Sequence, residues 1–140
     1  MAASNQPAAA KGIVTLEQLV AVQERVLELL EKEGVVPDAM RCCFHHPDAT
    51  VPELRETCRC RKPAPGMLLD AAAELAVDLR ASWMIGDTDS DVMAGAAAGC
   101  RTVLIALPSS AHKRSGAAYA DVHAVDLTAG VDAILAASAS

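Results

Sequence analysis

The sequence predicts an α/β protein with a parallel sheet flanked by helices, and three features lead to this prediction. Short apolar segments that suit buried strands, such as 82–85 (SWMI) and 101–107 (RTVLIAL), alternate with segments of helical periodicity. Gly and Pro stand where many of these segments begin or end. The chain has 140 residues, enough for one modest core, so we expect a single domain over residues 1–140.

Four segments carry helical patterns. Residues 15–33 place Leu and Val at i, i+3 and i+4 spacing, Thr15 with Gln18 makes a capping-box start, and Gly34 predicts the end. The other three are 65–80 with Pro and Gly at its entry, the small-residue segment 91–99, and the closing segment 128–139.

The remaining segments are extended or irregular. Besides the two apolar strands, residues 121–127 predict a strand and 35–44 an extended stretch, whereas 108–120 predict a loop. Ser4, Asn5 and Gln6, considered alone, predict a disordered tail.

Composition narrows the class of protein. A net charge of −6 gives no electrostatic reason to expect nucleic acid or an anionic membrane as a partner. No apolar run approaches the roughly 18 residues of a membrane span, and the first residues lack the apolar core of a secretory signal. We therefore expect a cytoplasmic protein whose cysteines stay reduced, where clustered cysteines more often bind metal than form disulfides.

Cysteine and histidine gather in one short window. Cys43-x-His45 and Cys58-x-Cys60 form two close pairs of soft ligands, which is the donor set of a structural Zn²⁺ site. Four protein ligands leave no position for water, so we predict a structural zinc loop over 42–61 without chemistry of its own.

Other interpretations of this window stay open. The thiols could cluster by chance, or pair as a disulfide in an oxidising compartment. Cys42 or His46 could also replace the neighbouring ligand, although the choice of Cys43 and His45 keeps the C-x-H and C-x-C pairs matched.

An acidic loop, GDTDSD, follows the strand at 82–85. Asp87 and Asp91 come just past the carboxyl end of that strand, where open α/β sheets bind ligands, and two carboxylates there can share Mg²⁺. Asp89 is a third candidate on the other side of the turn. The alternative is an Asp-rich helix N-terminus that serves capping and the helix dipole.

Two basic residues follow the cysteines. Lys62 offers a point charge for a phosphate group, and Arg61 adds a bidentate donor, although such pairs are often only solvated surface.

In this order, the motifs SNQ, C-x-H…C-x-C-R-K-P-x-P-G-M and GDTDSDVMAGAAAGCRTVLI resemble the zinc-loop phosphatases of the haloacid dehalogenase superfamily. The resemblance covers most of the chain and implies a Rossmannoid parallel sheet, with a monomer as the default. It implies a phosphoryl-binding hydroxyl at Ser4, substrate contacts at Asn5, Gln6 and Arg61, and a charge-neutralising lysine at Lys62. It implies Mg²⁺ at Asp87, supported by Asp91, and structural Zn²⁺ at the four ligands Cys43, His45, Cys58 and Cys60.

The family forms an aspartyl-phosphate that water then hydrolyses, with Mg²⁺ and the lysine spreading the developing charge. The implied substrate is a small phosphorylated sugar, foremost D-glycero-D-manno-heptose 1,7-bisphosphate, with histidinol phosphate as the alternative.

The chain also departs from the family. Its D-x-D-G-T loop, which carries the nucleophile after the first strand, has no counterpart here, so we expect that strand and the nucleophile to lie upstream. Thr88 stands where heptose bisphosphatases often carry lysine, which puts the sugar phosphate in doubt. A non-catalytic zinc-stabilised binding module and a zinc-ribbon adaptor are the rival hypotheses, and the adaptor gives Lys62 and GDTDSD no role.

Overall fold

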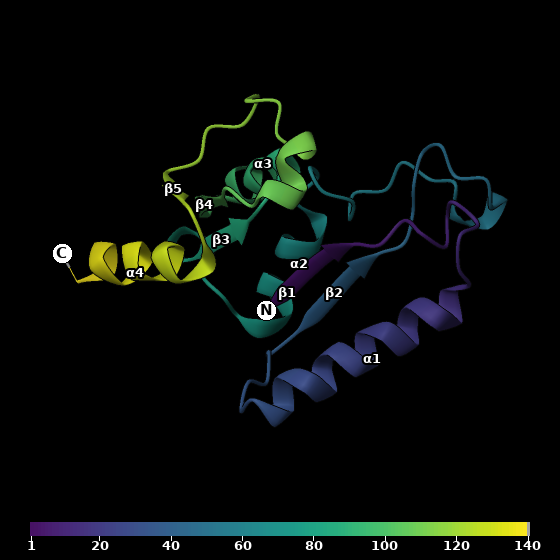
Figure 1. Ribbon diagram of the computed structural model, residues 1–140, viewed down its shortest axis with the longest axis horizontal. Helices are drawn as coiled ribbons and strands as arrows, with labels where there is room; N and C mark the ends of the chain where they lie inside the picture. Colours follow the sequence, from purple (N-terminus) through teal and green to yellow (C-terminus); the bar gives the residue numbers. More distant parts are fainter. Residues whose placement is uncertain (140) are drawn as a thin grey trace. The chain divides into compact units, whose positions relative to one another are not determined.

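The computed structural model describes residues 1–139 and contains two compact units, Met1–Arg61 and Lys62–Ser140. Each unit has parallel strands accompanied by helices, as Figure 1 shows, so the predicted α/β class with parallel sheets is confirmed. In the part of the chain described, no helix combines the length and the apolar character that crossing a bilayer requires.

The first unit is built on two parallel strands, β1 (Ala2–Asn5) and β2 (Met40–Cys43). In their register Ser4 lies opposite Cys42, and the Gln6 amide continues the ladder by donating to the Cys43 carbonyl at 2.8 Å. The disordered tail predicted for this segment is therefore wrong. The strand forms because β2, far along the sequence, supplies its hydrogen-bond partners.

Helix α1 (Leu16–Lys32) connects the two strands, and its start is the predicted one. The Thr15 hydroxyl accepts from the Gln18 amide at 3.1 Å, and the Gln18 side chain accepts from the Thr15 amide at 2.8 Å. Leu19 is the only buried residue of this helix, and Val22 on the same stripe is 59% exposed. The amphipathic pattern thus correctly predicts the helix, but most residues of its apolar stripe are exposed.

The segment after β2 is an irregular loop with one short 3₁₀ turn, η1 (Pro52–Leu54). It is anchored by backbone hydrogen bonds, because the Thr50 and Val51 amides both donate to the Ala10 carbonyl at 2.9 and 3.1 Å. Ala10 and Ala49 are fully or almost fully buried in this small core. These contacts hold the loop that carries the cysteines.

The second unit contains a three-stranded parallel sheet in the order β3 (Trp83–Gly86), β4 (Arg101–Ile105), β5 (Val122–Ala124). All three strands fall inside the segments predicted for them, apart from Gly86 at the end of β3. Val103 and Ile105 of β4 and Ala124 of β5 form the buried centre of the hydrophobic core of this unit.

Three helices accompany this sheet: α2 (Gly66–Leu75), α3 (Asp89–Ala98) and α4 (Leu127–Ser138). Helix α3 packs on β3 and β4, α4 packs on β4 and β5, and α2 contacts α3 (Figure 1). The small residues of α3 permit this packing. A Cβ atom at Gly95 would lie 2.5 Å from Cβ of Met84, so only glycine lets the helix come this close to β3.

Helix α2 ends earlier than the predicted segment 65–80. Ala76 adopts a left-handed backbone conformation with φ of 53° and closes the helix after Leu75. Asp78 then starts a 3₁₀ turn, η2 (Leu79–Ala81), by accepting from the Arg80 amide at 2.9 Å. The C-terminal part of that prediction was wrong because neither glycine nor proline marks this helix end.

Candidate functional site

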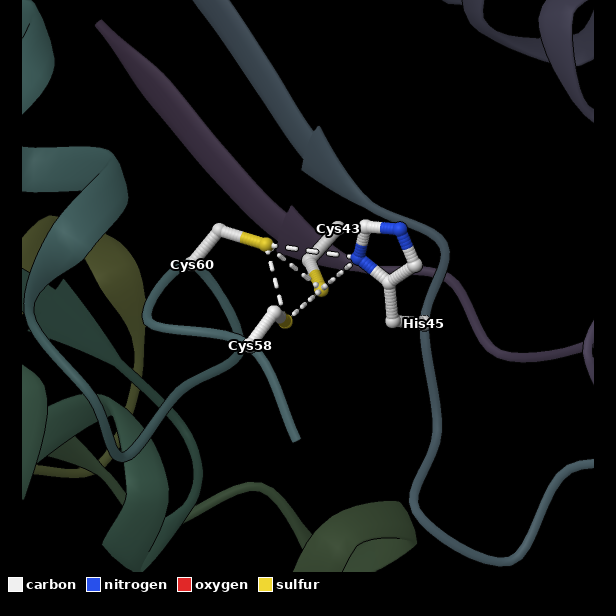
Figure 2. A group of neighbouring side chains, drawn as sticks. All are labelled: Cys43, His45, Cys58 and Cys60. Atoms are coloured by element: carbon white, nitrogen blue, oxygen red, sulfur yellow. Dashed lines mark hydrogen bonds between the residues drawn. The ribbon is translucent and has the colours of Figure 1, made fainter. Parts of the chain in front are cut away.

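The four predicted zinc ligands come together in the first unit (Figure 2). The three sulfur atoms lie 3.0 to 3.4 Å apart, and Nδ1 of His45 lies 3.6 Å from Sγ of Cys60 and 3.9 Å from Sγ of Cys43. A tetrahedral Zn²⁺ with bonds of about 2.3 Å to sulfur sets its ligands about 3.8 Å apart. The donor atoms therefore fit a tetrahedral ion with small adjustments.

The electrostatics of the cluster also suit a cation. Burial raises the pKa of Cys43. Burial would raise the pKa of Cys58 too, but hydrogen bonds with Cys60 and Cys43 outweigh it and lower that pKa to about 7. Burial and the hydrogen bond to Cys58 raise the pKa of Cys60. The three thiols resist ionising together, and a bound Zn²⁺ supplies the charge that lets them do so.

The two alternative ligands, Cys42 and His46, do not belong to the group of donor atoms within 4.8 Å of one another that the described residues form. Nδ1 of His46 instead accepts a hydrogen bond from the Asp48 amide at 3.1 Å. None of the five cysteines, all within the described residues, forms a disulfide. This geometry favours the matched pairs over the shifted ones.

In the second unit, Lys62 meets the acidic loop after β3. Nζ of Lys62 lies 2.6 Å from Oδ1 of Asp91, and both side chains are buried. Burial would raise the pKa of Asp91, but the hydrogen bond and the charge of Lys62 outweigh it and keep the pKa below its usual value. The ion pair therefore places the Lys62 ammonium group beside the turn at the carboxyl end of β3.

The second oxygen of Asp91 organises the turn itself. Oδ2 accepts from the Thr88 hydroxyl at 2.7 Å and from the amides of Thr88 and Asp87 at 3.1 and 3.2 Å. Thr88 with Asp91 is thus the capping box of α3, so the capping interpretation of the acidic loop holds for these residues. A Cβ atom at Gly86 would lie 2.6 Å from Oδ2, which is why glycine ends β3.

Asp87 has a carboxylate that stays open to a ligand. Its side chain is half-buried, and no hydrogen bond to its carboxylate is found within residues 1–139. Its backbone is fully engaged by comparison, because its amide donates to Asp91 and its carbonyl accepts two hydrogen bonds. A fixed backbone with a free carboxylate suits a hard cation such as Mg²⁺.

The residues that hold the Asp87 backbone were missed by sequence reasoning. The segment after β4, including the 3₁₀ turn η3 (Pro108–Lys113), donates to the Asp87 carbonyl through Oγ of Ser110 at 3.1 Å and Nη1 of Arg114 at 3.0 Å. Asp89 is the other anchor, since its Oδ2 accepts from the amide and hydroxyl of Ser115 at 2.7 and 2.8 Å. No local signal in 108–120 indicates these contacts.

The remaining predicted site residues lie in the first unit. Ser4 and Asn5 end β1, and Nε2 of Gln6 donates to Oγ of Ser4 at 2.9 Å. Arg61 donates from Nη1 to the carbonyl of His45 at 3.3 Å, beside the cysteine cluster. The structure thus describes two sets of predicted residues, one in each unit, and joins Lys62, Asp87 and Asp91 in the second.

Comparison with known proteins defines the class. A family model described as HAD-hydrolase-like matches residues 59–128, half of the chain, and the chain belongs to this family. A crystal structure of the D,D-heptose 1,7-bisphosphate phosphatase from B. bronchiseptica, complexed with magnesium and phosphate, superposes with a TM-score of 0.80. It is 31% identical, and the match covers 96% of this chain and 73% of that one.

Two relatives carry the same specific name, D-glycero-beta-D-manno-heptose-1,7-bisphosphate 7-phosphatase. The protein from Yersinia pestis is 42% identical over 118 residues, or 84% of this chain. The one from Photorhabdus laumondii is 46% identical over 91 residues, or 65% of this chain. The chain spans 63% of the length of the first relative and 48% of the second, so it corresponds to part of each.

Proposed function

We propose that the protein to which this chain belongs is a Mg²⁺-dependent phosphomonoesterase that removes phosphate from a small phosphorylated sugar. The observation that carries this proposal is the buried pair of Lys62 and Asp91 beside the open carboxylate of Asp87, at the carboxyl end of β3. A fixed cation and a cation-binding carboxylate at this edge match the demands of phosphoryl transfer, in which charge develops on the phosphoryl oxygens.

Each residue has a distinct role in this proposal. Asp87 would hold Mg²⁺, which when bound neutralises phosphoryl oxygens. Asp91 supports the same site without offering a free oxygen, because it holds Lys62 and the turn. Lys62 would stabilise the charge of the phosphoryl group. Ser4, Asn5, Gln6 and Arg61 remain proposed substrate contacts.

The nucleophile is a separate matter. We propose an aspartyl-phosphate mechanism, but residues 1–140 contain no D-x-D-G-T motif. Asp87-x-Asp89 does not substitute for it, because Asp89 is tied to Ser115 and belongs to the start of α3. Hydrolysis is therefore proposed for the whole protein rather than for these residues alone.

The names of the relatives and of the structural neighbour favour heptose 1,7-bisphosphate as the substrate, ahead of histidinol phosphate. Thr88 offers the substrate no positive charge, in contrast to the lysine that heptose bisphosphatases often carry at this position. Its hydroxyl hydrogen-bonds with Asp91 and Ser90 inside the loop. Zn²⁺ in the first unit would be structural. A reducing cytoplasm, which keeps its thiolate ligands free, and a monomeric state complete the proposal.

The test uses the protein as its native cell makes it, with its intact mass measured first. Phosphate release from heptose 1,7-bisphosphate should require Mg²⁺ and should fall by on the order of a hundredfold in Lys62→Ala and Asp87→Asn. Lys113→Ala, which removes an exposed lysine of the same unit, should leave the rate unchanged. Hydrolysis that is indifferent to Lys62 and Asp87 would favour the rival hypothesis of a zinc-stabilised binding module.

A further inference from the structure

His45 presents its two ring nitrogens to different partners. Nδ1 faces the sulfur atoms, as Figure 2 shows, and lies 3.6 Å from Sγ of Cys60. Nε2 lies 3.4 Å from Oε2 of Glu56, a residue outside the set of metal-binding side chains. The imidazole is therefore placed between the proposed metal position and a carboxylate.

The loop holds Glu56 in this place through its neighbours. The side chain of Arg55 donates from Nε to the Ala49 carbonyl at 2.7 Å, and the amide of His46 donates to the Leu54 carbonyl at 3.1 Å. These two hydrogen bonds join the chain just before Glu56 to the chain just after His45. These bonds thus bring the carboxylate of Glu56 close to the imidazole of His45.

We infer that Glu56 is a positioning residue for the metal centre, which orients His45 so that Nδ1 binds the ion. A neutral imidazole that ligates a metal through Nδ1 carries its proton on Nε2, and a carboxylate that accepts a hydrogen bond from this Nε2–H fixes both the tautomer and the ring orientation. The inference rests on the proposed zinc site. It assigns to Glu56 a role that neither the cysteine spacing nor the likeness to relatives suggests.

The exposure of the pair separates this role from a stabilising ion pair. The side chains of His45 and Glu56 are 32% and 58% exposed, so solvent screens their attraction and the pair adds little to folding. Loss of Glu56 should therefore change metal binding much more than the stability of the apo-protein. This difference makes the inference testable.

The experiment measures Zn²⁺ affinity of the whole chain by competition with a chromophoric chelator. Glu56→Ala should bind Zn²⁺ about tenfold more weakly than wild type, the lower end of what loss of such a partner costs. Glu56→Gln, which keeps an acceptor oxygen, should retain part of the affinity. Glu53→Ala, which removes an exposed carboxylate of the same loop, should bind as wild type.

A second measurement reports the geometry of the site directly. With Co²⁺ in place of Zn²⁺, the visible absorption bands should shift in Glu56→Ala and stay unchanged in Glu53→Ala. Equal affinities of wild type and Glu56→Ala would overturn the inference while leaving the zinc site intact. An equal loss in both alanine variants would also overturn it, because it would show a general charge effect. A wild-type chain that binds no Zn²⁺ would overturn the proposed metal centre itself.

Discussion

Nζ of Lys62 lies 2.6 Å from Oδ1 of Asp91, with 9% and 8% of the two side chains exposed. A buried pair of this kind costs desolvation energy for both ions, and removal of one partner leaves the other buried and uncompensated. We expect Lys62→Met to lower the free energy of unfolding by about 3 kcal/mol, measured by urea denaturation. Combining it with Asp91→Asn should recover part of the loss, whereas an additive double variant would contradict the coupling.

The proposed zinc ligands give the second prediction. Cys58→Ser and Cys60→Ser each remove one of four donors, so the purified variants should contain little or no zinc and should show a destabilised first unit. Metal content is measured by atomic emission after dialysis. Cys42→Ser and Cys100→Ser are the matched controls, because neither residue belongs to the cluster, and full zinc content in Cys58→Ser would reject the ligand assignment.

Gly95 sets the distance between α3 and β3. Gly95→Ala would place a methyl group 2.5 Å from Cβ of Met84, so the helix must move outward or Met84 must shift. We expect a loss of about 1–3 kcal/mol in the free energy of unfolding, typical of overpacking. Ala97→Ser, on the exposed side of the same helix, should change stability by less than about 0.5 kcal/mol.

Asp121 provides a pH dependence. Its Oδ2 accepts from the Thr102 amide at 2.6 Å and from the Thr102 hydroxyl at 3.0 Å, and these hydrogen bonds lower the pKa of Asp121 in the folded state. The stabilisation is present above the unfolded pKa of about 3.9 and is lost as the pH falls through the lower, folded value. The thermal unfolding midpoint should therefore decrease as the pH is lowered below about 4. The decrease should be less steep in Asp121→Asn.

The contacts of Arg114 predict the dynamics of the segment after β4. Its guanidinium donates to the carbonyls of Asp87 and Leu107 at 3.0 and 2.8 Å, and the bond to Asp87 is one of those that hold 108–115 against the acidic loop. Arg114→Ala should speed amide hydrogen exchange in 108–115 at least several-fold, while Lys113→Ala should not. Unchanged exchange in Arg114→Ala would show that the hydrogen bonds of Ser110 and Ser115 secure the segment without Arg114.

Local patterns predicted well what depends on neighbouring residues. The capping box at Thr15 and the strand around Val103 rest on short spacings and form as expected. The close pairs at Cys43 and Cys58 also come together, as their spacing suggested. The end of α2 at Ala76 was not predictable, because its left-handed conformation there has no glycine to announce it.

Contacts between distant segments account for most of what the sequence did not reveal. Ser4 belongs to a strand because it pairs with β2, and Arg114, which follows β4 in the sequence, holds the carbonyl of Asp87. Glu56 is unremarkable in the sequence, since one exposed carboxylate near a cysteine pair carries no periodic or spacing signal. The resemblance to a phosphatase family assigned Lys62 and the acidic loop to the same chemistry, but it did not predict the ion pair between Lys62 and Asp91.

The position of the metal centre in the chain has a consequence for biosynthesis. All four ligands lie between Cys43 and Cys60, ahead of Lys62 and of every strand of the second unit. A ribosome that makes this protein from its N-terminus releases the complete set of proposed ligands before it has released the second unit. If these residues bind Zn²⁺ as proposed, the zinc supply of the cell would act on the nascent polypeptide, and metal starvation would lower the yield of folded protein.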